Sequence, residues 1–245
     1  MAYVTCIFAI IVAFVFPVFA FFFFAKKFNG CGKTFLLGVW TFLVFQVFTR
    51  IPLLNLLGTQ ASFVALPSTA PFLYALIMGG SAALFEEGGR FVTMKIFMKK
   101  QNSALHGLSF AIGHGGIEAI LFVGLNAIIL LLNGSISSGL VSALDMFWAG
   151  LERVFAMCSH FGFTMLVLYA VKFKKYLYLL FAFLAHTLLD FVVVVLQLSG
   201  TSIAITELAV AVFGLAMLFV ALVLYKKIKI LDTPIKLENN TISEG

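Results

Sequence analysis

Long apolar runs separated by short polar segments occupy almost the whole chain. A helix needs about twenty apolar residues to cross the hydrocarbon core of a bilayer. Seven runs of this kind predict seven membrane-spanning helices, at about 3–25, 34–57, 70–94, 105–132, 144–171, 176–198 and 203–225. We expect a neutral loop containing Pro67 and Pro71 before the third run, and an uncharged loop over 133–139 after the fourth. The pattern therefore predicts an all-α, polytopic transmembrane helical bundle.

The lysines follow the first, third, fifth and seventh runs, and the other predicted loops contain none. Cytoplasmic loops of membrane proteins are enriched in lysine and arginine, so this asymmetry predicts an N-terminus outside and a C-terminus in the cytoplasm. We expect a single transmembrane domain over residues 1–228, followed by a polar cytoplasmic tail over 229–245.

The composition agrees with this interpretation. Apolar residues make up 62% of the chain and charged residues only 11%, too few to cover a soluble globule. The net charge of +6 comes from lysines in the predicted loops and tail, so it reports topology, and we expect no nucleic-acid partner. Cys6, Cys31 and Cys158 are scattered and predict neither a disulfide framework nor a thiolate metal site.

Acidic and imidazole side chains interrupt the third to sixth runs. Such groups are expensive inside a bilayer and usually serve a function there. With a rise of 1.5 Å per residue, one set falls at a common depth, roughly 12–18 Å from the lysine-rich edge. This set comprises Glu86, Glu87, His114, His160 and His186.

A second set of polar residues, Glu118, Glu152, Arg153 and Asp190, lies about one helical turn or more further out. Residues four apart share a helix face, as do His114 with Glu118 and His186 with Asp190. These polar stripes predict one buried site where the third to sixth helices meet, at about 70–198. Nearby glycines favour the close packing that such a site requires.

The residue types of this site suit hydrolysis of a peptide bond. His114, His160 and His186 are candidate metal ligands, with zinc as the expected ion. Glu86 or Glu87 is the candidate general base. A metal-free alternative remains open, in which a buried glutamate activates water and the histidines stabilise the oxyanion.

Five further residues are candidates for supporting roles. Glu118 would orient His114, and Asp190 would orient His186. Arg90 would hold one carboxylate ionised. Glu152 and Arg153 form either a structural ion pair or part of the site.

Three segments resemble the motifs of a known superfamily. They are Glu86-Glu87-Gly-Gly-Arg90, Phe110-Ala-Ile-Gly-His114 and His186-Thr-Leu-Leu-Asp190. They are similar to the EExxxR, FxxxH and HxxxN/D motifs of CAAX-processing and bacteriocin-processing membrane proteases. The spacing from Glu87 to Arg90 is one residue shorter, Asp190 replaces Asn, and His160 has no counterpart.

The seven-run layout, with Glu152 and Arg153 in the fifth run, more closely resembles the YhfC family of intramembrane metalloproteases. The resemblance implies membrane peptidase activity, with Glu86, Glu87 and His114 among the matched active-site positions and His186 as the fourth. It also implies a prokaryotic cell membrane as the location.

We therefore expect an intramembrane peptidase that acts on a peptide or membrane-protein substrate near the cytoplasmic leaflet. A proton-coupled transporter is an alternative, because intramembrane Glu, His and Asp chains also serve as proton relays. The chain has no evident internal repeat, which transporters often have. A non-catalytic scaffold or chaperone is the third possibility, because the resembling superfamily includes the scaffold subunit of γ-secretase.

Overall fold

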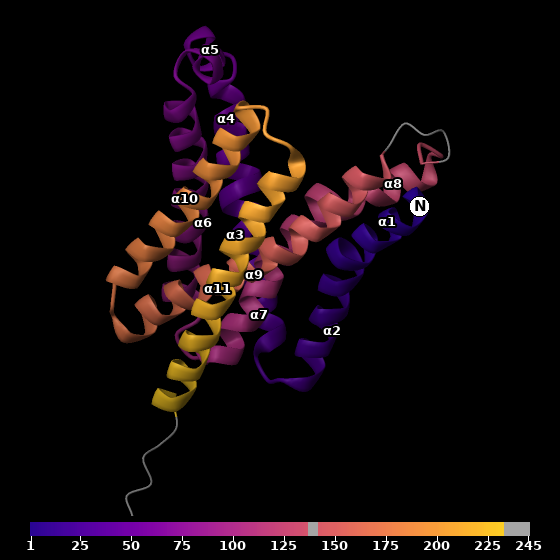
Figure 1. The fold of residues 1–245 in the computed structure, drawn as a ribbon. Helices are drawn as coiled ribbons and strands as arrows, with labels where there is room; N and C mark the ends of the chain where they lie inside the picture. Colours follow the sequence, from indigo (N-terminus) through magenta and orange to yellow (C-terminus); the bar gives the residue numbers. More distant parts are fainter. Residues whose placement is uncertain (137–141, 233–245) are drawn as a thin grey trace, which may run out of the picture.

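A computed structural model describes residues 1–136 and 142–232, and every regular element in these ranges is a helix (Figure 1). Three segments, labelled η, are π-helical and continue directly from the α-helices that flank them. The elements are α1 Ala2–Ile10, η1 Ile11–Val15, α2 Phe16–Lys27, α3 Cys31–Phe42, η2 Leu43–Arg50, α4 Ile51–Leu57, α5 Ala61–Thr69, α6 Pro71–Phe97, α7 Ala104–Ala119, η3 Ile120–Gly124, α8 Leu125–Leu132, α9 Ala143–Phe173, α10 Leu177–Leu198 and α11 Ile203–Asp232.

Six helical segments in the described part of the chain are long and apolar enough to cross a membrane, or seven if the bent pair α5–α6 is one span. The predicted all-helical, polytopic fold is therefore confirmed. Large apolar side chains such as Phe19, Phe72 and Phe219 are exposed on the outside of the bundle, as expected for helices that face lipid. The direction in which the chain crosses the bilayer remains a prediction from the lysines.

The expected loop around Pro67 and Pro71 is wrong in part, because the chain forms α5 there. Pro67 lies inside this short helix, and Pro71 is the first residue of α6. Ala70 between them has a non-helical backbone, as a residue before proline prefers. The axis bends by 115° at this point.

Two other predicted boundaries lie at the edge of the described residues. The expected loop over 133–139 is described only to residue 136. Helix α11 continues to Asp232, beyond the boundary expected at 228, and residues 233–245 of the expected tail lie outside the described ranges.

The four helices that carry the candidate residues, α6, α7, α9 and α10, belong to three closely packed pairs: α3 with α7, α6 with α10, and α9 with α11. In each pair a glycine faces a backbone carbonyl of the partner helix so closely that a Cβ atom would collide with it. These contacts are Gly38 against Phe110, Gly79 against Thr187, and Gly214 against Phe155.

The two ends of the bundle differ in charge. The lysine-rich end contains the connections near residues 26–33, 95–100 and 172–175 and the last turns of α11. The lysine-free end contains α5, residues 133–136 and the turn at 199–202. In Figure 1 the turn between α10 and α11 lies at the top and the end of α11 at the bottom.

Candidate active site

Helix α6 supplies the two carboxylates and one guanidinium at the centre of the site. Glu86, Glu87 and Arg90 are all buried, and Arg90 has no exposed surface. Arg90 Nη2 donates to Glu86 Oε2 at 3.2 Å, and Arg90 Nη1 donates to Glu87 Oε1. Spacings of three and four residues bring all three side chains to one face of the helix. The guanidinium thus compensates two carboxylates that the bilayer would otherwise strongly disfavour.

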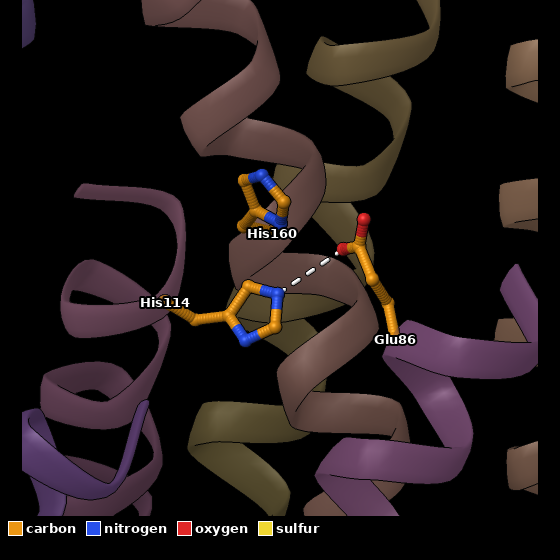
Figure 2. Close-up of side chains that lie close together, drawn as sticks. All are labelled: Glu86, His114 and His160. Carbon is orange, nitrogen blue, oxygen red and sulfur yellow. Dashed lines mark hydrogen bonds and ion pairs between the residues drawn. The ribbon is translucent and has the colours of Figure 1, made fainter. Parts of the chain in front are cut away.

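His114 of α7 contacts the first of these carboxylates (Figure 2). Its Nε2 donates to Glu86 Oε2 at 3.1 Å. The imidazole has no exposed surface and packs against the rings of Phe42 and Phe110. Its Nδ1 is buried and has no hydrogen-bond partner in the described part of the chain. In Figure 2 this nitrogen lies on the side of the ring that faces away from Glu86.

His160 of α9 joins the central network to a second group of charges. Arg90 Nη2 lies 2.7 Å from His160 Nδ1. Because a guanidinium can only donate, Nδ1 is the acceptor and the proton of the neutral ring is on Nε2. His160 Nε2 then donates to Glu118 Oε2 at 3.1 Å.

His186 of α10 contacts the second carboxylate of α6. Its Nδ1 donates to Glu87 Oε1 at 2.7 Å, and its ring stacks on Phe163 with a centroid separation of 4.6 Å. Asp190, one turn further along α10, has its Oδ2 3.7 Å from His186 Nε2, which is too long for a hydrogen bond. Asp190 therefore lies beside the ring as a nearby charge.

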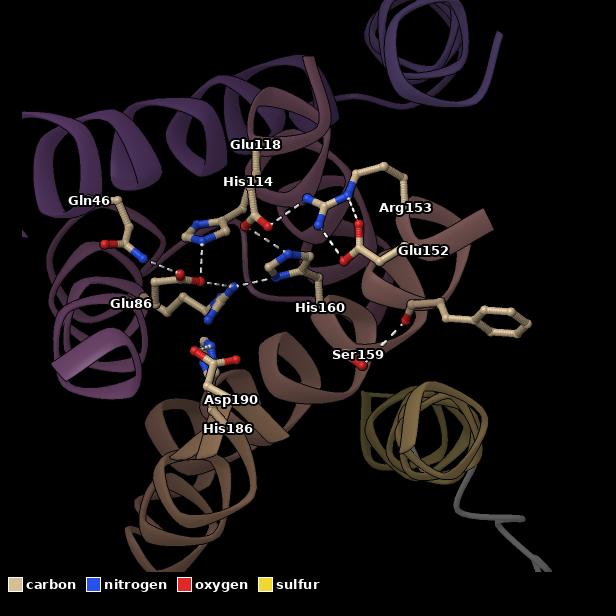
Figure 3. A network of polar contacts seen from close by, with 12 residues as sticks. Gln46, Glu86, His114, Glu118, Glu152, Arg153, Ser159, His160, His186 and Asp190 are labelled. Atoms are coloured by element: carbon tan, nitrogen blue, oxygen red, sulfur yellow. Dashed lines mark hydrogen bonds and ion pairs between the residues drawn. The ribbon is translucent and has the colours of Figure 1, made fainter. Parts of the chain in front are cut away.

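Arg153 of α9 holds the outer group of charges together (Figure 3). Its Nη1 donates to Glu118 Oε1 at 2.9 Å, and its Nε and Nη2 donate to Glu152. The expectation that Glu118 orients His114 is wrong, since Glu118 contacts His160 instead. Residues four apart on a helix differ by about 40° in direction. His114 accordingly faces α6, while Glu118 faces α9.

The structure thus brings all ten sequence-predicted residues into one region, and it adds two that the sequence analysis missed. Gln46 of η2 is buried, and its Nε2 donates to Glu86 Oε1 at 2.5 Å. Arg50, four residues later, donates to Ser81 Oγ and to the backbone carbonyl of Met78. The sequence does contain a signal for Gln46 and Arg50, because they are two polar residues four positions apart in an otherwise apolar run. Wide π-helical turns often occur at functional sites.

Nine of these twelve side chains border a chamber of about 530 Å³, and the other three, Glu87, Arg90 and His114, do not. Glu86, His160 and His186 lie at its deep end, and Asp145 and Glu207 lie among the lining residues near the ends of their helices. Glu87 does not line this chamber but borders a separate groove between α6 and α10. The two carboxylates of α6 therefore face different spaces.

Two buried groups have ligand atoms close enough together to hold a metal ion, within 4.8 Å of one another in each group. They are Glu86, His114 and His160, and Glu86, Glu87 and His186. Both offer imidazole nitrogen and carboxylate oxygen, and the first has the two-histidine, one-carboxylate set of many catalytic zinc sites. The partnerless atoms His114 Nδ1 and Glu87 Oε2 leave further donors available. The chemistry of the donors fits zinc.

The bundle and its buried site define a polytopic integral membrane protein with a Glu/His centre enclosed by helices. A family model described as YhfC intramembrane metalloprotease matches residues 11–144 and 139–213, and the chain belongs to this family. The chain is 31% identical over 248 residues to the membrane protein YhfC of Bacillus subtilis (strain 168), and this match covers 89% of the chain and 92% of the relative. No solved structure matches the chain. The family name indicates a membrane protease.

Proposed function

We propose that the chain is an intramembrane peptidase in which Glu86 acts as the general base on a water molecule in the chamber. One observation carries this proposal. Two carboxylates and three imidazoles, contributed by three different helix pairs, are buried together, and Glu86, His160 and His186 among them border an open space of about 530 Å³. Membrane proteins seldom bury so many ionisable groups without a use for them.

The geometry favours Glu86 over Glu87 as the base. Glu86 lines the chamber, and its carboxylate accepts hydrogen bonds from Gln46, Arg90 and His114. Donors of this kind stabilise a carboxylate, which can then accept a proton from water. Glu87 lies outside the chamber and is bound by Arg90 and His186, so its role is to position the His186 ring.

The cationic and imidazole groups would stabilise the charge that develops on the peptide oxygen. Arg90 and His160 lie next to Glu86, and His186 lies at the deep end of the chamber. Fixed donors in a water-poor site stabilise an oxyanion more strongly than water does. Glu118 supports this arrangement by accepting the His160 Nε2 proton.

Glu86, His114 and His160 are the residues that would hold zinc, with Glu86 using one carboxylate oxygen as a ligand and keeping the other available as the base. Zinc at this position would supply a Lewis acid for the peptide carbonyl and the attacking water. Arg90 now donates to both His160 Nδ1 and Glu86 Oε2. Both contacts must be released for these two atoms to act as ligands.

The test uses purified protein in liposomes, a quenched-fluorescent peptide library and metal analysis. We expect wild-type protein to hydrolyse at least one library peptide, and we expect Glu86→Gln to reduce kcat by at least a hundredfold. Glu238→Gln, in the expected tail, is the matched control and should behave as wild type. His114→Ala and His160→Ala should each lower the zinc content. Equal turnover by the wild type, Glu86→Gln and Glu87→Gln would overturn the assignment. Absence of hydrolysis together with solute flux that Glu86→Gln abolishes would indicate a transporter instead.

A further inference from the structure

The chamber extends from the middle of the bundle to only one of its two ends. Its outermost lining residues are at the beginning of α9, the end of α10 and the beginning of α11. They are Asp145, Ala149, Gln197, Ile203 and Glu207. All of these lie at the lysine-free end. We propose that substrate reaches Glu86 through this end as a positively charged peptide segment, an inference that rests on the proposed peptidase function.

Packed apolar side chains close the other end of the chamber. Beyond Phe163, toward the lysine-rich end, a buried cluster includes Met94, Phe110, Met165 and Leu168, each at most 1% exposed. A separate cavity of about 270 Å³ at the lysine-rich end is lined by lysines, apolar residues, Asn102 and Tyr176, with no carboxylate or histidine among its described lining residues. The interior is close-packed between the two spaces. A peptide arriving at the lysine-rich end therefore meets no path to Glu86.

This arrangement changes the expectation drawn from the sequence about the side of the membrane. The depth of the candidate residues suggested a substrate near the cytoplasmic leaflet. With lysines on the cytoplasmic side, the mouth of the chamber opens on the outer side instead. The site would then act on peptides presented from outside the cytoplasm.

The net charge of the residues that line the chamber favours a substrate of the opposite charge. Six carboxylates and two guanidinium groups line it, and Arg90 is paired with one of these carboxylates, Glu86. The excess is three negative charges when every carboxylate is ionised and the histidines are neutral, although the whole chain carries +6. The carboxylates are Glu86, Glu118, Asp145, Glu152, Asp190 and Glu207, and the guanidinium groups are Arg50 and Arg153.

Two of the carboxylates near the mouth have no compensating partner within residues 1–136 and 142–232. Arg153 neutralises Glu118 and Glu152. No ion pair or hydrogen bond to another described residue involves the carboxylate of Asp145, and Glu207 Oε2 is inaccessible to solvent and has no hydrogen-bond partner. A buried acceptor of this kind requires a donor, which a lysine or arginine side chain or an N-terminal amine supplies. A low-dielectric cleft of one sign also concentrates the opposite charge by about 10- to 1,000-fold.

A groove on the lipid-facing side offers a competing route. It lies between α6 and α10, is lined by Leu84, Gly88, Leu180 and other residues, and reaches Glu87. This groove is apolar except for Glu87 and does not border Glu86. A substrate that enters by this groove would not meet the carboxylates of the mouth. The two routes therefore predict that water-soluble reagents reach different introduced cysteines.

Cysteine labelling tests the route without relying on peptidase activity. In a Cys158→Ala background, Ala156→Cys places a thiol in the chamber and Lys99→Cys places one at the lysine-rich end. Leu84→Cys, exposed toward lipid, is the matched control for the groove. Membrane-impermeant methanethiosulfonate reagents are applied to intact cells and to inside-out vesicles. We expect Ala156→Cys to react only in intact cells, Lys99→Cys only in inside-out vesicles, and Leu84→Cys in neither.

The charge preference is measured with cationic and anionic forms of the same reagent, each normalised to a free thiol in solution. The cationic form should modify Ala156→Cys at least tenfold faster, and Asp145→Asn with Glu207→Gln should reduce this ratio at least fivefold. Among library peptides that are hydrolysed, those containing lysine should have lower KM than those containing glutamate. Labelling of Ala156→Cys from the cytoplasmic side, or equal normalised rates for the two reagents, would overturn the inference. The labelling pattern is measured without peptide hydrolysis, so it can hold even where Glu86→Gln fails to reduce turnover, and the two proposals fail separately.

Discussion

Replacing Gln46 tests whether the π-helical segment η2 belongs to the active site. The side chain is buried, and Nε2 donates to Glu86 Oε1 at 2.5 Å. Gln46→Met keeps a similar length and volume but removes the donor. Arg50 remains anchored, because it keeps its bonds to Ser81 and to the Met78 carbonyl. The substitution therefore removes one hydrogen bond from Glu86 and leaves those from Arg90 and His114 in place.

The size of the effect follows from the kind of bond that is lost. A hydrogen bond to a charged group contributes about 1.5–3 kcal/mol. If the bond holds the Glu86 carboxylate in the position from which it takes a proton, its loss raises the free energy of the transition state by this amount. Each 1.36 kcal/mol corresponds to a tenfold change in rate, so kcat should fall by about 10- to 150-fold. KM should change little, because Gln46 would hold the base and not the peptide.

The assay compares kcat, KM and thermal unfolding in detergent for the wild type, Gln46→Met and Gln197→Met. Gln197 lines the same chamber near its mouth and is exposed, so it serves as the matched control. Gln46→Glu places a second carboxylate against Glu86 and should be at least as damaging as Gln46→Met. A kcat within twofold of the wild type for Gln46→Met, with folding intact, would refute the positioning role. A rise in KM together with the fall in kcat would indicate that Gln46 contacts substrate directly.

Three further predictions follow from the packing and the ion pairs. Arg90→Met leaves Glu86 and Glu87 uncompensated in the bilayer and should destabilise the fold by about 3–5 kcal/mol. The measurement is the loss of folded protein on heating in detergent, and unchanged stability would contradict the central role of the Arg90 ion pairs. Gly115→Ala places a Cβ 2.5 Å from His160 Cδ2, so it should displace that ring and reduce zinc content and turnover. Gly88→Ala is the control, because its Cβ meets no atom within 4 Å, and it should leave zinc content and turnover intact. Equal effects of the two substitutions would show that crowding at the His160 ring is unimportant. Glu118→Gln removes the carboxylate acceptor of His160 Nε2 and should weaken zinc affinity by about 10- to 100-fold. Titration with a zinc chelator measures this affinity. An unchanged affinity would exclude His160 as a zinc ligand that Glu118 orients.

Much of the fold was predictable, because hydropathy is a local property of each segment. The number of spans and the common depth of Glu86 and the three buried histidines follow from run lengths and the helical rise alone. The bend at Ala70 was harder to predict, because Pro67 is accommodated inside α5 while the backbone before Pro71 breaks the helix.

The partners within the site were less accessible to sequence reasoning. Spacing within one helix places His114 and Glu118 on a shared stripe, but the rotation of neighbouring helices decides which groups they meet. Glu118 therefore pairs with His160 of α9, which no local pattern specifies. Gln46 was missed because its span contributes no carboxylate or imidazole at the common depth, and its contact with Glu86 depends on the packing of η2 beside α6.

The three glycine-packed helix pairs imply how this molecule can move. Within each pair, backbone meets backbone, so sliding or separation would open voids along a closely packed seam. Between the pairs, several of the joints are polar: Gln46 and His114 meet Glu86 across one boundary, and Arg90 meets His160 across another. Hydrogen bonds of this kind can be exchanged for bonds to water, a peptide or an ion at little net cost. The chamber should accordingly widen when whole helix pairs tilt as rigid units about the charged centre. Binding of water, a peptide or an ion at the active site would then set how far the bundle opens.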